Sequence, residues 1–532
     1  MRVILFLSLA VATAIGAVIE RSPIYLNKEV SSSAGPAVLQ PYMSYSIEFC
    51  YFPDYAGNKS NPNQFSNQLL DNLAAIQGTK PYIRVGGNTQ DYALYNASLE
   101  YAINGTIIPS KSEDYPYILY IGPSFFESYS TWPDTKFIHG YNLGKNGSDS
   151  LKSLLDTVPL VCKALQGGKL AYWELGNEPD LYKTSSQGIV RPANWTEQGY
   201  VDEWLSKSRK IRAALAKSCP EMAADENYKY IAPSFAGLRN SLDPVKTWED
   251  GLDSDKNIAL NSEHDYMGGA TQPGVTLQGT LMNHTATVNN VNPFKNLSRV
   301  LAAKNLTTDI PLILGEHNSL YNEGAPGLSN AFGAALWGID WNLYAASQGI
   351  QRQHMHQGTD YRYASWQPVQ TEKTTLGTKP PYYGNIFVAE MVRGGSNVQI
   401  MNLPLSNETE AAYAAYVNGQ LTRFAVVNLV EYNYTDSDPT ATRPSVSYSF
   451  QLPSGIGSVS VQRLMANGSN SISGITWDGY SYNYELAGGK PVRLSNVTVG
   501  ETARVDKDGV VNINVPYSSA VLLTVNHGGG SA

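Results

Sequence analysis

The sequence predicts a (β/α)8 barrel followed by an antiparallel β-sandwich. Between about residues 42 and 392, short apolar segments alternate with longer segments of helical periodicity, and eight apolar segments can be counted. After residue 392 the helical periodicity stops, and short alternating segments broken by Gly, Asn, Asp and Pro follow. The 532 residues are enough for a large barrel and a smaller second domain.

The predicted barrel strands are apolar segments that end in polar or turn-forming residues. In chain order they are 42–48, 81–86, 137–143, 170–178, 230–235, 258–266, 312–316 and 349–356. The helical periodicity between them predicts helices at 63–77, 150–166, 200–217, 292–304 and 327–346. An open doubly wound sheet is the alternative, but no G-x-G-x-x-G turn follows the first strand.

The second domain is predicted from segments in which apolar and polar residues alternate. These strands are 411–417, 422–429, 445–450, 458–464, 492–499 and 520–525. Residues 18–34 form an N-terminal segment whose β-like part, 23–30, is expected to add a strand to this sandwich. The predicted boundaries are therefore 35–392 for the barrel and 393–532 for the sandwich.

The N-terminus has the form of a secretory signal peptide. Met1-Arg2 precedes an apolar stretch at residues 3–16 that is too short to span a bilayer, and we expect cleavage after Ala17. No other stretch is long and apolar enough for a membrane helix, so a secreted, extracellular protein is expected. N-x-S/T motifs predict N-glycans on several of Asn58, Asn96, Asn104, Asn146, Asn194, Asn283, Asn296, Asn305, Asn407, Asn433, Asn467 and Asn496.

Charge and cysteine content narrow the possible partners and cross-links. The formal charge of −8 argues against nucleic acid as a partner. The three cysteines are Cys50, Cys162 and Cys219, and an odd number allows at most one internal bridge. Cys162 and Cys219 both lie near the ends of predicted helices in successive βα units, so we expect these two to pair.

Two glutamates are the candidate catalytic residues. Glu178 ends the fourth predicted strand in the sequence YWELGNEPDLY, and Glu316 ends the seventh. Active sites of (β/α)8 barrels lie at the carboxyl ends of the strands, so these carboxyl groups are expected to meet. Two facing carboxyl groups are the minimum for glycoside hydrolysis, because one protonates the departing oxygen and the other attacks or activates water.

An ordered set of motifs resembles glycoside hydrolase family 79, within the clan of retaining (β/α)8 enzymes, and looks most like its secreted fungal β-glucuronidases. The motifs are YMSYSIEF (42–49), YIRVGGNTQD (82–91), YWELGNEPDLY (172–182), EHDYMGG (263–269), ILGEHNSLYNEG (313–324) and PPYYGN (380–385). The resemblance implies that Glu178 is the acid/base and Glu316 the nucleophile, about 5–5.5 Å apart.

The resemblance also implies roles for residues near the two glutamates. Asn177 would bind the sugar 2-hydroxyl, and Tyr266 would donate to Glu316 and hold its pKa down. The substrate carboxylate would be received by Tyr321 and by Tyr383 with the backbone amide of Gly384.

Polar residues on the first two strands complete the candidate site. Arg84 is expected to support Glu316 by its charge, with a salt bridge inside the barrel as the alternative. Glu48, Asn88 and Asp91 are expected to bind sugar hydroxyls, with a structural role as the alternative. His354 and His356 form an H-x-H pattern, but no Asp, Glu or Cys near them completes a metal-binding set. We therefore expect no metal and no cofactor.

Three functions are compatible with these residues. The first is a retaining exo-β-glucuronidase that removes terminal glucuronic acid, or its 4-O-methyl form, from glycans. An endo-β-glucuronidase of the type that cleaves heparan or hyaluronan is the second, although no cluster of Lys or Arg flanks the motifs. A non-catalytic carbohydrate-binding protein is the third, which the two intact carboxyl groups disfavour. The long insertion at 88–136 would close a pocket and so favours exo action.

Overall fold

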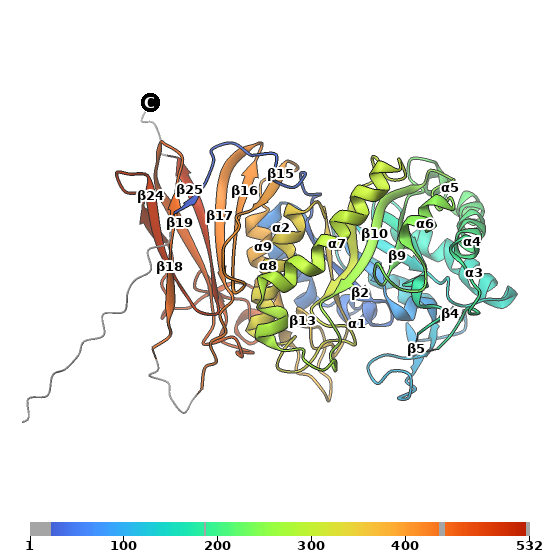
Figure 1. Ribbon diagram of the computed structural model, residues 1–532. Helices are drawn as coiled ribbons and strands as arrows, with labels where there is room; N and C mark the ends of the chain where they lie inside the picture. The colour runs from blue at the N-terminus through green and yellow to red at the C-terminus, as the bar shows by residue number, and fades with distance from the viewer. Residues whose placement is uncertain (1–22, 186–187, 436–441, 528–532) are drawn as a thin grey trace, which may run out of the picture.

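The computed structural model describes residues 23–185, 188–435 and 442–527. Residues 1–17, the predicted signal peptide, lie outside the described part of the chain, as do residues 18–22 of the predicted N-terminal segment. Two bodies lie side by side, a barrel surrounded by helices and a β-sandwich (Figure 1).

Within the described residues, eight parallel strands close into a barrel, as the sequence predicts. β2 pairs with both β3 and β12, which closes the ring. Six strands differ from the prediction at an end. β2, β3 and β12 begin one, two and four residues later, β7 and β8 stop two and three residues early, and β11 and β12 run two and one residues further. The strands are β2 (Met43–Glu48), β3 (Ile83–Gly86), β7 (Phe137–Tyr141), β8 (Leu170–Leu175), β9 (Tyr230–Phe235), β10 (Ile258–Tyr266), β11 (Leu312–Asn318) and β12 (Gln353–Gln357).

The predicted helices lie around the barrel (Figure 1). The helix predicted at 292–304 begins earlier, since the Asn283 side chain accepts a hydrogen bond from the Ala286 N–H and caps its first turn. The helix predicted at 327–346 begins later, at Phe332. Their observed bounds are α2 (Gln64–Gln77), α3 (Ser148–Leu165), α4 (Glu197–Ser218), α7 (His284–Ala303) and α8 (Phe332–Ser347), and the short α6 (Pro244–Glu249) follows β9.

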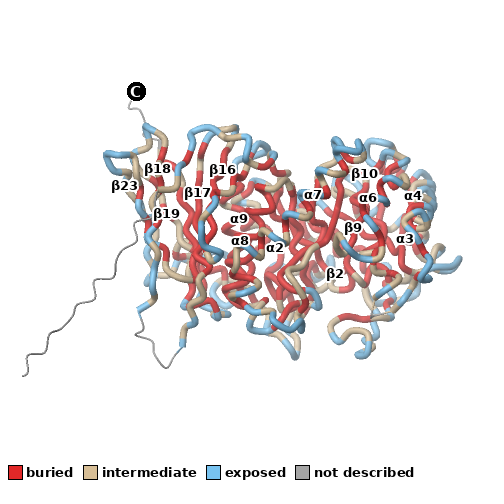
Figure 2. The backbone as a smooth tube through the Cα atoms, in the orientation of Figure 1, coloured by how far each residue is buried: buried red, intermediate tan, exposed pale blue. Residues whose placement is uncertain are grey.

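A helix that the sequence analysis did not assign, α9 (Pro380–Met391), packs against α8. Every residue of α8 is buried, because the two helices lie between the barrel and the sandwich (Figure 2). Gly384 lies at the crossing, where a Cβ atom would come within 2.5 Å of the Ala335 carbonyl oxygen. Only glycine allows this approach.

The disulfide between Cys162 and Cys219 joins α3 to the end of α4 and confirms the predicted pairing. The two Cα atoms are 6.1 Å apart, and the cysteines are separated by 57 positions in the chain. Cys50 is buried with a free thiol.

The insertion after β3 folds over the carboxyl ends of the barrel strands. β6 (Ile118–Ile121) pairs with β4 (Ala93–Tyr95) and with β5 (Ile103–Thr106), and the 3-10 helix η3 (Pro123–Ser130) follows. The side chains of this insertion form part of the cavity described below.

The C-terminal domain is an antiparallel sandwich, as predicted (Figure 1). The large sheet places β25 (Ser519–His527) between β17 (Gln420–Asn428) and β19 (Ile456–Met465) and continues through β16 (Glu410–Val417) to β15 (Val398–Asn402).

The facing sheet of the sandwich joins β18 (Ser445–Gln451) to β24 (Val510–Pro516) and to β1 (Ile24–Tyr25), which comes from the N-terminal segment. The strand predicted at 492–499 is shorter, since only Val492–Arg493 (β22) is extended and paired.

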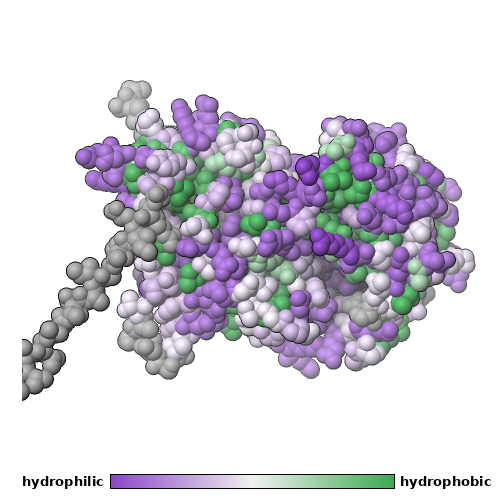
Figure 3. All heavy atoms as spheres, viewed as in Figure 1, coloured by the Kyte–Doolittle hydropathy of each residue, from purple (hydrophilic) through white to green (hydrophobic). Residues whose placement is uncertain are grey.

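Polar side chains cover most of the face seen in Figure 3. Among the described residues, no helix combines the length and the apolar character needed to cross a membrane.

Candidate active site

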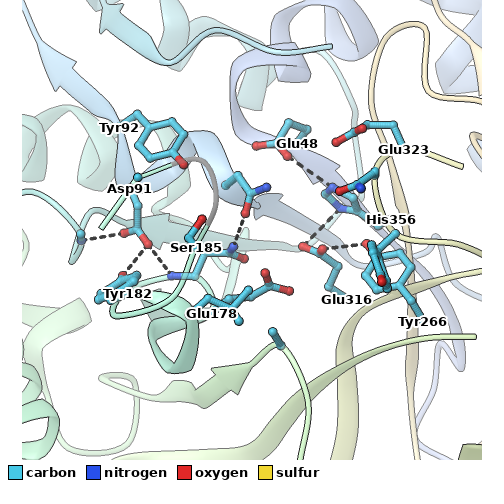
Figure 4. Close-up of a pocket in the computed structure, with 18 of the residues that line it drawn as sticks. Glu48, Asp91, Tyr92, Glu178, Tyr182, Ser185, Tyr266, Glu316, Glu323 and His356 are labelled. Atoms are coloured by element: carbon cyan, nitrogen blue, oxygen red, sulfur yellow. Dashed lines mark hydrogen bonds and ion pairs between the residues drawn. The ribbon is translucent and has the colours of Figure 1, made fainter. Parts of the chain in front are cut away.

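A cavity of about 550 Å3 lies at the carboxyl ends of the barrel strands. Side chains at or just beyond the strand ends line it, among them Glu48, Glu178, Tyr266, Glu316 and His356 (Figure 4). The barrel therefore brings together residues as far apart in the sequence as Glu48 and Tyr363.

Glu178 and Glu316 meet in this cavity, with an oxygen atom of each within 4.8 Å of the other. The separation matches the roughly 5–5.5 Å of retaining glycosidases rather than the roughly 6.5–9.5 Å of inverting enzymes. Glu178 lies in a turn beyond β8, not at the strand end. Gly176 and Glu178 both have positive φ angles, 84° and 49°, which end the extended backbone before Pro179. Positive φ is costly for a non-glycine residue and is concentrated at functional sites.

The two carboxyl groups have opposite pKa shifts. Burial and the neighbouring charge of Glu316 raise the pKa of Glu178 to about 8. Burial alone would also raise the pKa of Glu316, but His356, His264, Arg84 and the Tyr266 hydroxyl outweigh it and hold that pKa well below its usual range. At neutral pH Glu178 is therefore protonated and Glu316 is ionised, which is the division of roles that an acid and a nucleophile need.

Arg84 is the charged centre of the site and is fully buried. Its Nη1 donates to Glu316 at 2.5 Å, its Nε to Glu174 at 2.9 Å and its Nη2 to the Asn177 side-chain oxygen at 2.7 Å. The sequence predicts two alternative roles for Arg84, support of Glu316 and a salt bridge inside the barrel. The one guanidinium group does both. Glu174, which the sequence analysis missed, is the second carboxylate of this pair of bridges.

Further groups hold each of these two carboxyl groups in place. The Tyr266 hydroxyl donates to Glu316 at 2.8 Å. His356 lies 3.5 Å from the same carboxylate and 2.8 Å from the Ser46 hydroxyl. His264, which was not singled out in the EHDYMGG motif, lies with Nδ1 3.0 Å from Glu178. Burial lowers the pKa of His264 to about 4, so the ring facing Glu178 is neutral at neutral pH.

The polar residues at the first two strand ends differ in how many of their polar atoms are already hydrogen-bonded within the protein. Glu48 faces the cavity while accepting from the Thr89 N–H and hydroxyl. Asn88 lies beside Asn177, which donates to it at 3.0 Å. Asp91 borders the cavity but accepts from the backbone of Leu143, Gly144 and Asn177 and from Tyr182. The Asp91 carboxylate therefore holds three loops together. This is the structural role that the sequence analysis gave as the alternative to binding sugar hydroxyls.

The predicted carboxylate receivers are only partly brought together. Tyr321 lines the cavity, but Tyr383 and Gly384 do not. The Tyr383 hydroxyl is buried against the sandwich, where it contacts Ser481 and Asn483, because α9 begins at Pro380 and runs outside the barrel. The prediction for this pair is wrong. Tyr363, 20 positions earlier, lines the cavity instead, with its ring 6.1 Å from that of Tyr266.

Side-chain oxygen and nitrogen atoms of Glu178, His264 and Glu316 lie close enough to be considered as metal ligands. Glu316 is already bound to the Arg84 guanidinium at 2.5 Å. A cation at this position would lie beside that positive charge, so the donor set does not fit a metal.

A (β/α)8 barrel that presents two close carboxyl groups of opposite protonation defines a glycoside hydrolase. The model of the glycosyl hydrolase family 79 C-terminal β domain matches residues 412–522. A β-glucuronidase of Aspergillus niger is 67% identical over 512 residues, which cover 95% of this chain and 94% of that protein. The chain belongs to glycoside hydrolase family 79.

A second relative supports this assignment, and two solved structures share the fold. A β-glucuronidase of Neurospora crassa is 55% identical over 495 residues, 87% of this chain and 88% of that protein. The fold is shared with a 4-O-α-L-rhamnosyl-β-D-glucuronidase of Fusarium oxysporum, at a TM-score of 0.75, 24% identity and coverage of 94% and 100%. A family 51 α-L-arabinofuranosidase of Bifidobacterium longum has a TM-score of 0.60 at 14% identity, with coverage of 95% and 100%.

Proposed function

We propose that the protein is a retaining exo-β-glucuronidase that removes terminal β-linked glucuronic acid, or its 4-O-methyl form, from glycans. The opposite protonation of Glu178 and Glu316 at retaining distance carries the proposal. The substrate class is supported by the two similar fungal β-glucuronidases.

In the first step the ionised Glu316 attacks the anomeric carbon, and Glu178 gives its proton to the departing oxygen. In the second step Glu178, now ionised, takes a proton from water, which attacks the same carbon and releases Glu316. The guanidinium of Arg84 fixes the Asn177 amide, so that the amide can bind the sugar hydroxyl next to the reacting carbon.

The substrate carboxylate is received by tyrosine hydroxyl groups. Tyr321 and Tyr363 both line the cavity on the side of Glu316, after β11 and β12. A neutral receiver binds a carboxylate by hydrogen bonds without placing a mobile cation beside the nucleophile. Glu48 and Asn88 would bind hydroxyl groups of the same sugar.

Exo action is favoured over endo action by the insertion that crosses the cavity. Asp114 of the insertion is bound bidentately by Arg362 at 2.7 and 3.1 Å and accepts from Tyr51 through its carbonyl. Within the insertion, Tyr115 accepts from Asn88 at 2.8 Å. The insertion is therefore fixed to the segments that follow β2 and β12, and its residues Tyr92 and Tyr117 line the cavity. Among the described residues that line the cavity, Lys145 is the only Lys or Arg, whereas a sulfated polymer would require several.

Secretion and N-glycosylation belong to the same proposal. Eleven of the twelve predicted acceptor asparagines are exposed. Asn283 is the exception, because its side chain is half-buried and caps α7, so we expect no glycan there.

The proposal is tested with variants of the two glutamates on aryl β-glucuronides, β-glucosides and α-arabinofuranosides. Glu316→Ala and Glu178→Ala should each lower glucuronide turnover by at least about 10²–10⁴-fold, while the exposed control Glu100→Gln should not. Added azide should restore Glu178→Ala and give the β-azide. An α-azide, or hydrolysis confined to the other glycosides, would refute the proposal.

A further inference from the structure

The catalytic cavity has a second half that the two-carboxylate mechanism does not use. Glu178 lies between the two halves in Figure 4, with Glu316, His356 and Glu48 on one side and Tyr92 and Ser185 on the other. The general acid protonates the glycosidic oxygen, so the leaving group lies beyond Glu178, on the side away from the nucleophile. The half that contains Tyr92 is therefore where the leaving group lies.

Aromatic rings form one wall of this half. The rings of Tyr92 and Tyr117 are 4.9 Å apart and both line the cavity. Burial raises the pKa of the Tyr92 hydroxyl most, followed by the charge of Asp91, and Glu178 makes a smaller contribution. The wall thus begins at the acid and continues outward through Tyr117. Exposed faces of aromatic rings pack against the C–H faces of sugar rings, and the hydroxyl groups bind at the rim.

Polar groups face these rings. The Lys145 ammonium group lies 5.9 Å from the centre of the Tyr117 ring and also lines the cavity. Among the described residues, no carboxylate lies within 4.0 Å of it, so it is available as a donor. Thr184, Asn240 and Val190 complete the boundary. Aromatic rings together with ammonium, hydroxyl and amide groups in one cavity suit a pyranose, which has apolar faces and a hydroxyl-bearing edge.

We propose that Tyr92, Tyr117 and Lys145 form a subsite for the sugar unit to which the terminal uronic acid is attached, with Lys145 determining leaving-group specificity. The cavity of about 550 Å3 is in the range that encloses ligands larger than one sugar ring. The inference rests on the proposed function, and it adds which residues of the cavity bind the sugar that departs.

The test compares two substrates that differ only in the leaving group. β-Glucuronyl fluoride has no leaving sugar, whereas β-glucuronosyl disaccharides with hexose or pentose reducing units fill both halves. Lys145→Met and Tyr117→Ala should lower kcat/KM for the best disaccharide by about 10- to 100-fold, the range expected for losing a charged hydrogen bond. For the fluoride, kcat/KM should change less than about 2-fold, because neither substitution alters Glu316 or the two steps that it carries out.

Lys163→Met is the matched control, since Lys163 is an exposed lysine on α3 outside the cavity. It should leave disaccharide kinetics unchanged. Transfer of the glucuronyl group to an added sugar provides a second measurement. A 4-nitrophenyl hexoside added during fluoride turnover attacks the glycosyl–Glu316 ester through a hydroxyl oxygen, whose proton passes to ionised Glu178. The ratio of transfer to hydrolysis should fall in Lys145→Met and Tyr117→Ala.

Each outcome separates this inference from the proposed function. If the wild type cleaves neither the fluoride nor any disaccharide, the proposed function fails. If it cleaves the fluoride but no disaccharide, the sugar subsite is overturned, while the retaining β-glucuronidase chemistry of the proposed function stands. The subsite would also be overturned if kcat/KM fell equally for the fluoride and the disaccharide. It would be overturned as well if neither variant lowered kcat/KM for the disaccharide and the transfer ratio stayed unchanged.

Discussion

Replacing Tyr266 by phenylalanine removes one hydrogen bond from the nucleophile and leaves the ring in place. The hydroxyl donates to Glu316 at 2.8 Å and is the only group lost. A hydrogen bond to a charged acceptor contributes about 1.5–3 kcal/mol, and about 1.4 kcal/mol corresponds to one pKa unit. The pKa of Glu316 should therefore rise by about 1–2 units.

The shift has a defined direction in the pH profile of kcat/KM. That profile reports groups of the free enzyme, and Glu316 must be ionised to attack. Its low pKa places the acid limb of the wild type well below the usual range of a glutamate. The limb of Tyr266→Phe should lie about 1–2 units higher. The alkaline limb, where Glu178 loses its proton at a pKa of about 8, should stay in place.

The assay is initial-rate hydrolysis of an aryl β-glucuronide over a wide pH range, restricted to pH values at which the enzymes remain folded. The substrate carboxyl titrates identically with both enzymes, so it cancels in the comparison. Tyr344→Phe is the control, because this tyrosine bonds to Asn292 on α7, outside the cavity. Coincident acid limbs for Tyr266→Phe and the wild type would refute the assigned role of the hydroxyl.

Two further predictions concern the stability of the fold. Burial lowers the pKa of His284, but the charge of Asp340 at 2.8 Å outweighs it and raises that pKa. The pair should stabilise the fold fully below about pH 6.5 and lose this contribution as pH rises through the raised pKa. Urea unfolding of His284→Ala measures the effect. A destabilisation that stays the same as pH rises would contradict the prediction. Replacing Cys162 and Cys219 by serine should lower the free energy of unfolding by about 4 kcal/mol, given the 57-residue separation; an unchanged urea midpoint would show that the bridge does not constrain the unfolded chain.

The barrel could be predicted from the sequence because parallel strands buried on both faces appear as short, continuous apolar segments. Glu178 and Glu316 could be found for a related reason, since each carboxyl group closely follows such a segment. Their partners were harder to find. Glu174 lies inside an apolar strand, and only the fold reveals the bonds that its buried charge makes to Arg84 at 2.9 Å and to the Ser234 hydroxyl at 2.7 Å. His264 similarly needs the fold to place it 3.0 Å from Glu178.

The error at Tyr383 has a physical explanation. Both Tyr363 and Tyr383 follow the last barrel strand, and the path of a long connection does not follow from local sequence. Pro380 and Pro381 favour the start of a helix, and the apolar residues up to Met391 indicate a helix buried on all sides. Such a helix has to lie between two layers of the fold. It therefore carries Tyr383 away from the cavity, whereas Tyr363 remains in the loop that borders it.

The charges at the centre of the barrel explain why one arginine can serve both the fold and the chemistry. Arg84 bears one positive charge and contacts two carboxylates, Glu174 and Glu316, while Glu178 is kept protonated. These three side chains therefore have one surplus negative charge in a buried region, at the carboxylate that faces the substrate. The transition state of glycoside hydrolysis develops positive charge at the anomeric carbon, so this surplus is compensated most fully when that charge appears. If Glu178 were ionised as well, the surplus would double and the acid would be lost, which is why the same geometry must raise the pKa of Glu178 while it lowers that of Glu316.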